Sequence, residues 1–172
     1  DVLRLVNEPT AAAMAYGLGK GTGGVTAVYD FGGGTFDLTV LDISDRTFEV
    51  LVTDGDSQLG GDDLDRALVQ LLVDEFYQQY GVDLTHTPET LLRLKEEAER
   101  VKIELSSVRQ AQVSLPFLTQ VEGEPIHLER TVTRSELEQL IEPLIQRSTE
   151  ICEPALAARR MKPSDVNRVI LV

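Results

Sequence analysis

The stretch that restricts the fold most is Asp30-Phe31-Gly32-Gly33-Gly34-Thr35-Phe36-Asp37, in which three consecutive glycines lie between two aspartates. The residues that lead into it from Val25 are typical of a buried strand. Those that follow it up to Val40 alternate apolar and polar side chains, as a half-buried strand does. A third strand is predicted over Thr47–Thr53. The glycines therefore join strand to strand within an antiparallel meander.

The chemistry of this turn suits an anion. Without Cβ atoms, the glycines let several backbone N–H groups converge on phosphate oxygens. The Thr35 hydroxyl adds a donor, and the carboxylates of Asp30 and Asp37 are hard ligands for Mg²⁺, normally through water, or for a monovalent cation. The same spacing also fits a plain glycine-rich hairpin turn with solvated acids. A P-loop is excluded, because no lysine follows and a strand rather than a helix comes next.

Further along the chain, apolar residues three and four apart predict long amphipathic helices over 62–80 and 87–106. Two strand-like segments between Gln112 and Thr133 predict a hairpin. Thr133 and Glu136 form a capping box that opens another helix towards Arg159. Prolines at 143 and 154 predict kinks or a break in that helix. A base of residues 1–61 and 134–172 is therefore expected, with residues 62–133 inserted as a second subdomain.

Glu99, Lys102 and Ser106 lie three and four residues apart, so they share one face of the second long helix. Such a strip could hold a ribose and a base, although an ordinary Glu–Lys pair on a solvated face has the same spacing. His86 and His127 have no companion at ligand spacing and are interpreted as surface residues. A zinc site is unsupported.

The composition is that of a soluble globular protein: 172 residues, 42% hydrophobic and 26% charged. Sixteen basic and 29 acidic residues give a net charge of -13, which argues against nucleic-acid binding. The single cysteine, Cys152, cannot form an internal disulfide, and it is interpreted as a small apolar helix residue. The sequence contains no apolar run long enough for a membrane span and no signal-peptide pattern, so a cytoplasmic setting is expected.

Both ends of the chain are apolar. Val2–Val6 and Val166–Val172 are typical of buried strands, the latter covered on both faces, yet each begins or ends abruptly. We expect a fragment of a longer protein, truncated at both ends. Apolar surface exposed by the truncation would favour self-association.

Motifs along the whole chain closely resemble the ATPase domain of DnaK-type heat-shock chaperones. They occur in that family's order and at its separations, and Ile103 indicates the bacterial branch. The motifs are Asn7-Glu8-Pro9-Thr10-Ala11-Ala12-Ala13, the Asp30–Asp37 turn, Gly55-Asp56 with Leu59-Gly60-Gly61-Asp62-Asp63-Leu64-Asp65, and Lys102-Ile103-Glu104-Leu105-Ser106-Ser107.

The resemblance implies an α/β fold of the actin-like ATPase (ribonuclease H-like) type. The chain would hold most of the second lobe: a base with a mixed sheet and an inserted helical subdomain that carries a β-hairpin. The first lobe, with the other phosphate loop and the catalytic lysine, would precede Asp1. A glycine pair that completes the adenosine pocket would follow Val172.

The resemblance also implies roles for individual residues toward ATP or ADP, Mg²⁺ and K⁺. The glycine turn and Thr35 would hold phosphates, Glu8 and Asp30 would orient the magnesium shell and the attacking water, and Asp37 with Thr35 would contact potassium. The remaining positions would contact the ribose and adenosine; they are Gly61, Glu99, Lys102 and Ser106.

In such a chaperone, ATP hydrolysis controls the binding of unfolded polypeptide by a separate domain. The implied partners are a nucleotide exchange factor, a J-domain co-chaperone, and the interdomain linker and peptide-binding domain of the parent protein. Glu49, Val50 and Leu51 are expected on an exposed sheet edge, where the linker would add as a strand. Two alternatives remain open: a non-catalytic docking module for these co-chaperones, or a sugar kinase of the same superfamily. The isolated fragment is expected to be inactive.

Overall fold

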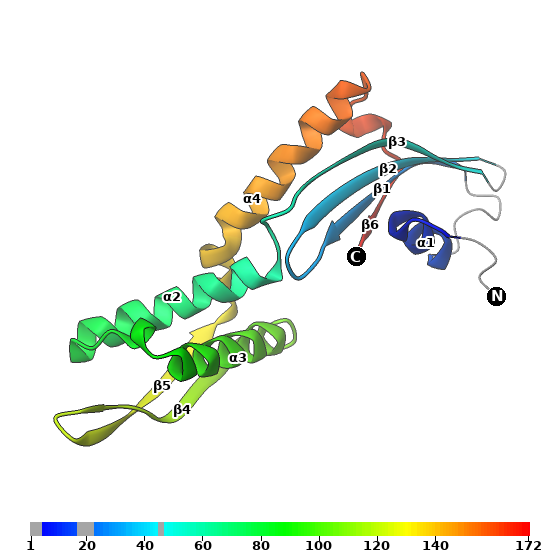
Figure 1. Ribbon diagram of the computed structural model, residues 1–172. Coiled ribbons are helices and arrows are strands. Elements are labelled where there is room, and N and C mark those ends of the chain that lie inside the picture. The colour runs from blue at the N-terminus through cyan, green and yellow to red at the C-terminus, as the bar shows by residue number, and fades with distance from the viewer. Residues whose placement is uncertain (1–4, 17–22, 45–46) are drawn as a thin grey trace. The chain divides into compact units, whose positions relative to one another are not determined.

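The computed structural model describes residues 5–16, 23–44 and 47–172 (Figure 1). The chain folds as two units. Unit 1 consists of Asp1–Gly61 and Leu144–Val172, and unit 2 consists of Asp62–Pro143. No helix in the part of the chain that the structure describes is both long and apolar enough to cross a membrane.

Unit 1 contains a mixed sheet whose described strands have the order β3-β2-β1-β6. Strands β1 (Gly24–Phe31), β2 (Phe36–Ser44) and β3 (Thr47–Asp56) form the predicted antiparallel meander. Strand β6 (Arg168–Leu171), which follows the short 3-10 helix η2 (Pro163–Asp165), pairs in parallel with β1. The predicted α/β class and mixed sheet are confirmed.

Helices cover both faces of this sheet. Helix α1 (Glu8–Ala15) buries Ala13 on one face, and the end of α4 (Arg134–Ala158) buries Ala155 and Leu156 on the other. Successive β2 side chains point to alternate faces, so β2 contributes to both clusters. This is why the expected apolar–polar alternation fails at Leu41. The buried β2 residues of the two clusters are Phe36, Leu38 and Val40 on the α4 face and Leu41 and Ile43 on the α1 face.

Strand β3 lies at an edge of the described sheet, as predicted for Glu49–Leu51. Its pairing with β2 contains a bulge, because Val40 pairs with Val52 and Leu41 with Val50. Leu51 is the extra residue. The edge therefore changes its hydrogen-bonding register at Leu51.

For the residues that the structure describes, the expected strand at the C-terminal end is confirmed as β6, but its burial on both faces and the strand at the N-terminal end are not. Leu5 and Val6 are not in a strand and are 90% and 46% exposed, while Val2 and Leu3 lie outside the described residues. In β6, Ile170 is buried but its neighbours Val169 and Leu171 are exposed. Hydrophobicity alone predicted burial, whereas burial also requires a neighbouring element to cover the residue.

Unit 2 packs two helices against a hairpin. Helices α2 (Gly61–Tyr80) and α3 (Pro88–Leu105) flank the 3-10 helix η1 (Leu84–His86), and β4 (Gln110–Val121) pairs antiparallel with β5 (Glu124–Thr133). These elements match the predicted helices and hairpin. Their core includes the apolar stripe of α3, which consists of Leu94, Ala98, Val101 and Leu105.

The first residues of α4 belong to unit 2. Unit 2 therefore ends at Pro143, rather than at the expected residue 133. The reason is packing: Leu137 is buried in the core of unit 2, and Leu140 and Ile141 pack against that core. Capping residues locate the start of a helix, but they do not show which core its first turns join.

Helix α4 continues through Pro143 and Pro154, so the predicted break does not occur. Each proline removes one N–H donor, which leaves the carbonyl four residues earlier without that partner. Both prolines are exposed, as are Gln139 and Glu150, which carry those carbonyls. Water can therefore satisfy the carbonyls at little cost.

Candidate functional site

The glycine turn connects β1 to β2 in unit 1. Phe31 pairs with Phe36, and the N–H of Gly32 donates to the carbonyl oxygen of Thr35 at 2.9 Å. Gly33, Gly34 and Thr35 are exposed. The buried Phe36 ring, which packs beside Tyr29 and Phe31, anchors the hairpin while its tip faces solvent.

The fold does not require glycine at positions 33 and 34. Neither residue has a left-handed φ, and no described atom lies within 4 Å of a Cβ built on either one. At Gly32, by contrast, a Cβ would lie 3.3 Å from the carbonyl oxygen of Thr35, which is a tight contact. Side chains at positions 33 and 34 would therefore fill open space, whereas one at position 32 would crowd the turn. The turn therefore keeps its backbone accessible, as a phosphate cradle requires.

Asp30 and Asp37 are directly opposite on β1 and β2, so both carboxylates lie on the face of the sheet that α1 covers. Thr35 Oγ1 donates to Asp37 Oδ2 at 3.0 Å. A Cβ on Gly55 would clash with the carbonyl oxygen of Phe36 and lie 3.2 Å from Asp37 Oδ1, so glycine at position 55 lets β3 pass close to this backbone and its carboxylate. Like charges directly opposite destabilise a sheet, and a bound cation would offset that repulsion.

Glu8 is exposed at the start of α1, the helix that packs on this same face. Among the residues that the structure describes, no three His, Cys, Asp or Glu side chains gather closely enough to hold a metal ion directly. The donor set of Asp30, Asp37 and Thr35 still fits a hydrated Mg²⁺ or a K⁺ that also has phosphate oxygens as ligands.

The connection from β3 to α2 lies against the glycine turn. The N–H of Gly61 donates to the carbonyl oxygen of Gly32 at 2.9 Å. A Cβ on Gly60 would lie 2.5 Å from the carbonyl oxygen of Gly33. The resemblance implies that Gly61 lies near the ribose, and in the structure its backbone N–H binds the turn itself.

In unit 2, α3 carries Glu99 and Lys102 beside its buried apolar stripe, and Ser106 follows its last residue. Lys102 Nζ forms an ion pair with Asp65 Oδ1 of α2 at 2.8 Å, and both side chains are less than one-quarter exposed. Sequence reasoning missed this partner, although Asp65 belongs to the Leu59–Asp65 motif. The Asp65 carboxylate holds the Lys102 ammonium in one place.

Glu99 and Ser106 are exposed, and Ser106 caps the C-terminus of α3. Glu99 lines a hollow of about 280 Å³ between α2 and α3, whose walls also include Asp65 and Lys95. The structure thus brings Glu99 close to the partner of Lys102.

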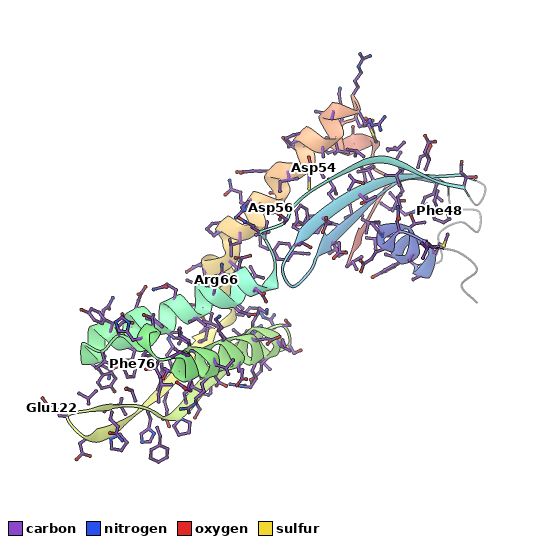
Figure 2. All side chains as sticks on the ribbon, in the orientation of Figure 1. Phe48, Asp54, Asp56, Arg66, Phe76 and Glu122 are labelled. Atoms are coloured by element: carbon purple, nitrogen blue, oxygen red, sulfur yellow. The ribbon has the colours of Figure 1, made fainter. Side chains whose placement is uncertain are left out.

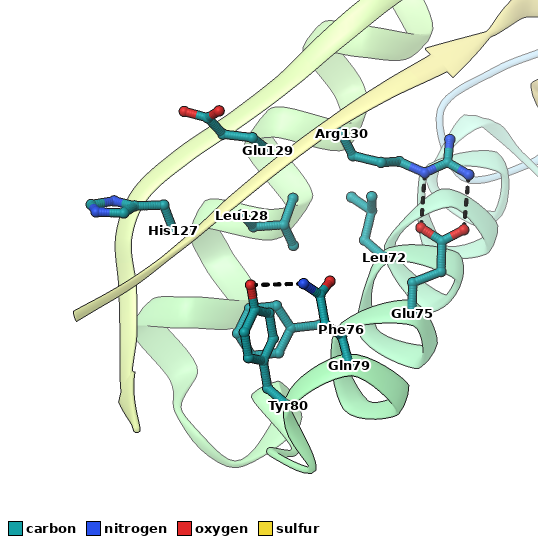
Figure 3. A pocket seen from close by; sticks show the side chains of 9 residues that line it. All are labelled: Leu72, Glu75, Phe76, Gln79, Tyr80, His127, Leu128, Glu129 and Arg130. Atoms are coloured by element: carbon teal, nitrogen blue, oxygen red, sulfur yellow. Dashed lines mark hydrogen bonds and ion pairs between the residues drawn. The ribbon is translucent and has the colours of Figure 1, made fainter. Parts of the chain in front are cut away.

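A second hollow in unit 2, of about 360 Å³, lies between α2 and β5 and contains none of the predicted site residues (Figure 3). Its floor is the core residues Leu72, Phe76 and Leu128. Arg130 lines it but is bound by Glu75 of α2 through two hydrogen bonds of 2.8 Å. Its guanidinium therefore holds the hairpin to α2.

The two histidines are exposed, as predicted. His127 Nδ1 accepts a hydrogen bond from the N–H of Phe117 at 2.9 Å, and His86 lies 3.4 Å from the Asp83 carboxylate. Cys152 is half-buried on α4, and burial raises the pKa of its thiol.

Comparison with known sequences assigns the chain to a class of proteins. A sequence model of the Hsp70 protein family matches residues 1–172. The chain is 49% identical over 172 residues to a chaperone protein DnaK of Cyanidium caldarium. It is 51% identical over 177 residues to a chaperone protein DnaK of Buchnera aphidicola subsp. Schizaphis graminum (strain Sg). Both alignments cover the whole chain and 28% of the relative's length.

The chain therefore belongs to the Hsp70 family, and the predicted resemblance is confirmed.

Proposed function

We propose that this chain holds most of the second lobe of the nucleotide-binding domain of an ATP-dependent chaperone. Hydrolysis of ATP in the intact protein would control the binding of unfolded polypeptide by a separate domain. One observation carries the proposal: the exposed turn at Gly33 and Gly34 leaves open space that the fold itself does not need. Similarity along the whole of this chain to proteins named as DnaK chaperones supports it.

At the turn, the backbone N–H groups of Gly32, Gly33 and Gly34 and the Thr35 hydroxyl would bind the phosphates. Glu8 and Asp30 would orient the water shell of Mg²⁺ and the attacking water, and Asp37 with Thr35 would contact K⁺. When bound, these cations would neutralise phosphate charge, which matters in a chain of net charge -13.

In unit 2, Glu99, Lys102 and Ser106 would form one wall for an adenosine. In unit 1, Gly61 would lie near the ribose. The Lys102–Asp65 ion pair supports this assignment, because a lysine held at a fixed position loses less conformational entropy when a ligand binds.

The exposed edge at Glu49–Leu51 would accept the interdomain linker as an added strand, which would connect nucleotide binding to the peptide-binding domain. An exchange factor and a J-domain co-chaperone would be further partners. We propose a cytoplasmic location. Membership of the Hsp70 family argues against the sugar-kinase alternative.

Calorimetric titration of the full-length protein with ADP, in Mg²⁺ and K⁺, tests the proposal. Saturable ADP binding that the isolated 172-residue chain shows only weakly would support a site shared with another lobe. A full-length protein that binds its co-chaperones but never ADP would instead favour the docking-module alternative.

A further inference from the structure

The position of the glycine turn depends on the neighbouring connection between β3 and α2. The turn is exposed at its tip, whereas Leu59 of the connection is fully buried with Phe36 in the core of unit 1. Gly60 packs on Gly33, and Gly61 donates to Gly32. The turn therefore rests on a segment that is more firmly fixed than itself.

That segment is anchored at its start by Asp56, the last residue of β3, which Figure 2 labels. Asp56 Oδ1 accepts a hydrogen bond from the N–H of Gln58 at 2.9 Å. Asp56 Oδ2 forms an ion pair with the Arg147 guanidinium of α4. The two carboxylate oxygens thus bind two different segments: one shapes the connection, and the other attaches it to the helix.

The environment of Asp56 keeps this anchor ionised. The Gln58 N–H, followed by the Arg147 guanidinium, holds the pKa of the Asp56 carboxyl below its usual value, while partial burial opposes the shift. The Asp56 side chain is 18% exposed and Arg147 is 47% exposed. At neutral pH the contact is therefore between two full charges.

A line of contacts thus runs through unit 1 from Arg147 to Asp56, along the connection through Gln58 to Gly60, and onto the turn at Gly33. We propose that Asp56 and Arg147 are positioning residues for the phosphate cradle: they hold the β3–α2 connection where it fixes the glycine turn for the phosphates of a bound nucleotide.

This inference rests on the proposed function, since it assumes that the turn binds phosphates. A positioning role predicts different effects on ADP and adenosine binding, whereas a general loss of stability would weaken both. Adenosine lacks phosphates, so displacement of the turn should weaken ADP binding and leave adenosine binding unchanged. Phosphate binding at a cradle of backbone N–H groups is sensitive to position, because each N–H···O bond weakens as its geometry deteriorates.

The experiment measures ADP and adenosine affinities of the full-length protein by calorimetry, with thermal unfolding recorded for every variant. Arg147→Gln removes the ion pair and is expected to weaken ADP binding about tenfold, which corresponds to about 1.4 kcal/mol. Asp56→Asn keeps an oxygen for the Gln58 N–H but loses the charge. Its ADP affinity should therefore equal that of Arg147→Gln. Arg147→Lys should recover part of the affinity. Arg159→Gln removes an exposed positive charge beyond the end of the same helix and should change nothing.

Three outcomes are decisive against the inference. If wild type binds ADP and Arg147→Gln and Asp56→Asn bind it equally well, the positioning role is wrong while the proposed function stands. If ADP and adenosine affinities fall together with the melting temperature, the pair serves the fold alone. If wild type binds no ADP at all, the proposed function fails and the inference fails with it. The inference is supported if the variants keep the wild-type melting temperature and lose affinity for ADP but not for adenosine.

Discussion

Gly60 lies so close to Gly33 that a Cβ atom on Gly60 would sit 2.5 Å from the Gly33 carbonyl oxygen. A Cβ on Gly33 itself would meet no described atom within 4 Å. The two glycines touch, yet they are glycine for different reasons. Position 60 has no room for a side chain, whereas position 33 has room that the fold leaves unused.

Substitution should separate these two roles. Gly60→Ala is expected to destabilise the protein by about 1–3 kcal/mol, the usual cost of overpacking against rigid backbone. Gly33→Ala should change stability by less than about 0.5 kcal/mol but weaken ADP binding, because its methyl group enters the cradle. Urea denaturation and ADP titration of both variants check this. Equal ADP affinity for Gly33→Ala and wild type would exclude the turn as a phosphate site.

Loss of the Lys102 ammonium should affect both binding and stability. Lys102→Met is expected to weaken nucleotide binding by roughly 1–3 kcal/mol, the range for a charge-assisted hydrogen bond. It also leaves Asp65, which is 13% exposed, without this ion-pair partner, so the melting temperature should fall. Adding Asp65→Asn should restore the melting temperature without restoring ADP affinity. Lys162→Met, at an exposed lysine of unit 1, serves as the control. A double variant that regains ADP binding would assign Lys102 to the fold alone.

The free energy of unfolding should depend on pH through the ionisation of Glu136. The Arg130 guanidinium lowers the pKa of the Glu136 carboxyl, with help from the N–H of Thr133 and against the effect of burial. A lowered pKa means that the stabilisation is present above the unfolded value of about 4.3 and is lost as pH falls through the folded value. Glu136→Gln should therefore cost up to about 1 kcal/mol at pH 7, since the carboxylate is partly solvated, and little at pH 3.

Urea denaturation of the 172-residue chain at several pH values measures this difference. The matched control is Glu138→Gln, an exposed glutamate on the same helix. A cost for Glu136→Gln that is the same at pH 7 and pH 3 would show that the ion pair contributes nothing to the pH dependence.

The isolated chain is expected to fold without hydrolysing ATP at a meaningful rate. Phosphoryl transfer depends on positioning and on electrostatic stabilisation of the transferring group. The turn is solvent-exposed in unit 1, so its hydrogen bonds act in a high dielectric. Steady-state phosphate release with Mg²⁺ and K⁺ present measures this rate. Turnover equal to that of a full-length Hsp70 protein would mean that these 172 residues contain all of the catalytic groups.

Local patterns in the sequence predicted the elements well. Apolar residues recur along α2 and α3 because one face of each helix is buried, and they alternate around β2 because one sheet face is buried. Both patterns can be recognised from residues that are close in sequence. The capping box at Thr133 likewise located the start of α4. By contrast, Leu5 and Leu171 are apolar but exposed, because burial depends on whether another element covers the residue.

The contacts that shape the candidate site are long-range, and spacing could not predict them. Lys102 was a candidate on its own helix, but its partner Asp65 lies on another helix of unit 2. Gly60 and Asp56 were visible as parts of a motif, yet their roles depend on Gly33 and Arg147, from other segments of the chain. Only the folded structure brings those backbones and charges into contact.

The pairing of β6 with β1 has a consequence for the order in which the chain folds. Thr26 pairs with Arg168, so the described sheet of unit 1 includes neighbouring strands that lie far apart in the sequence. Unit 2 lies between them as one continuous stretch and can form from contacts close in sequence, which close small loops and form fast. We expect the hairpin and helices of unit 2 to fold first during synthesis. Until Arg168–Leu171 emerge from the ribosome, β1 has an unpaired edge, which makes the nascent chain itself a temporary candidate for chaperone protection.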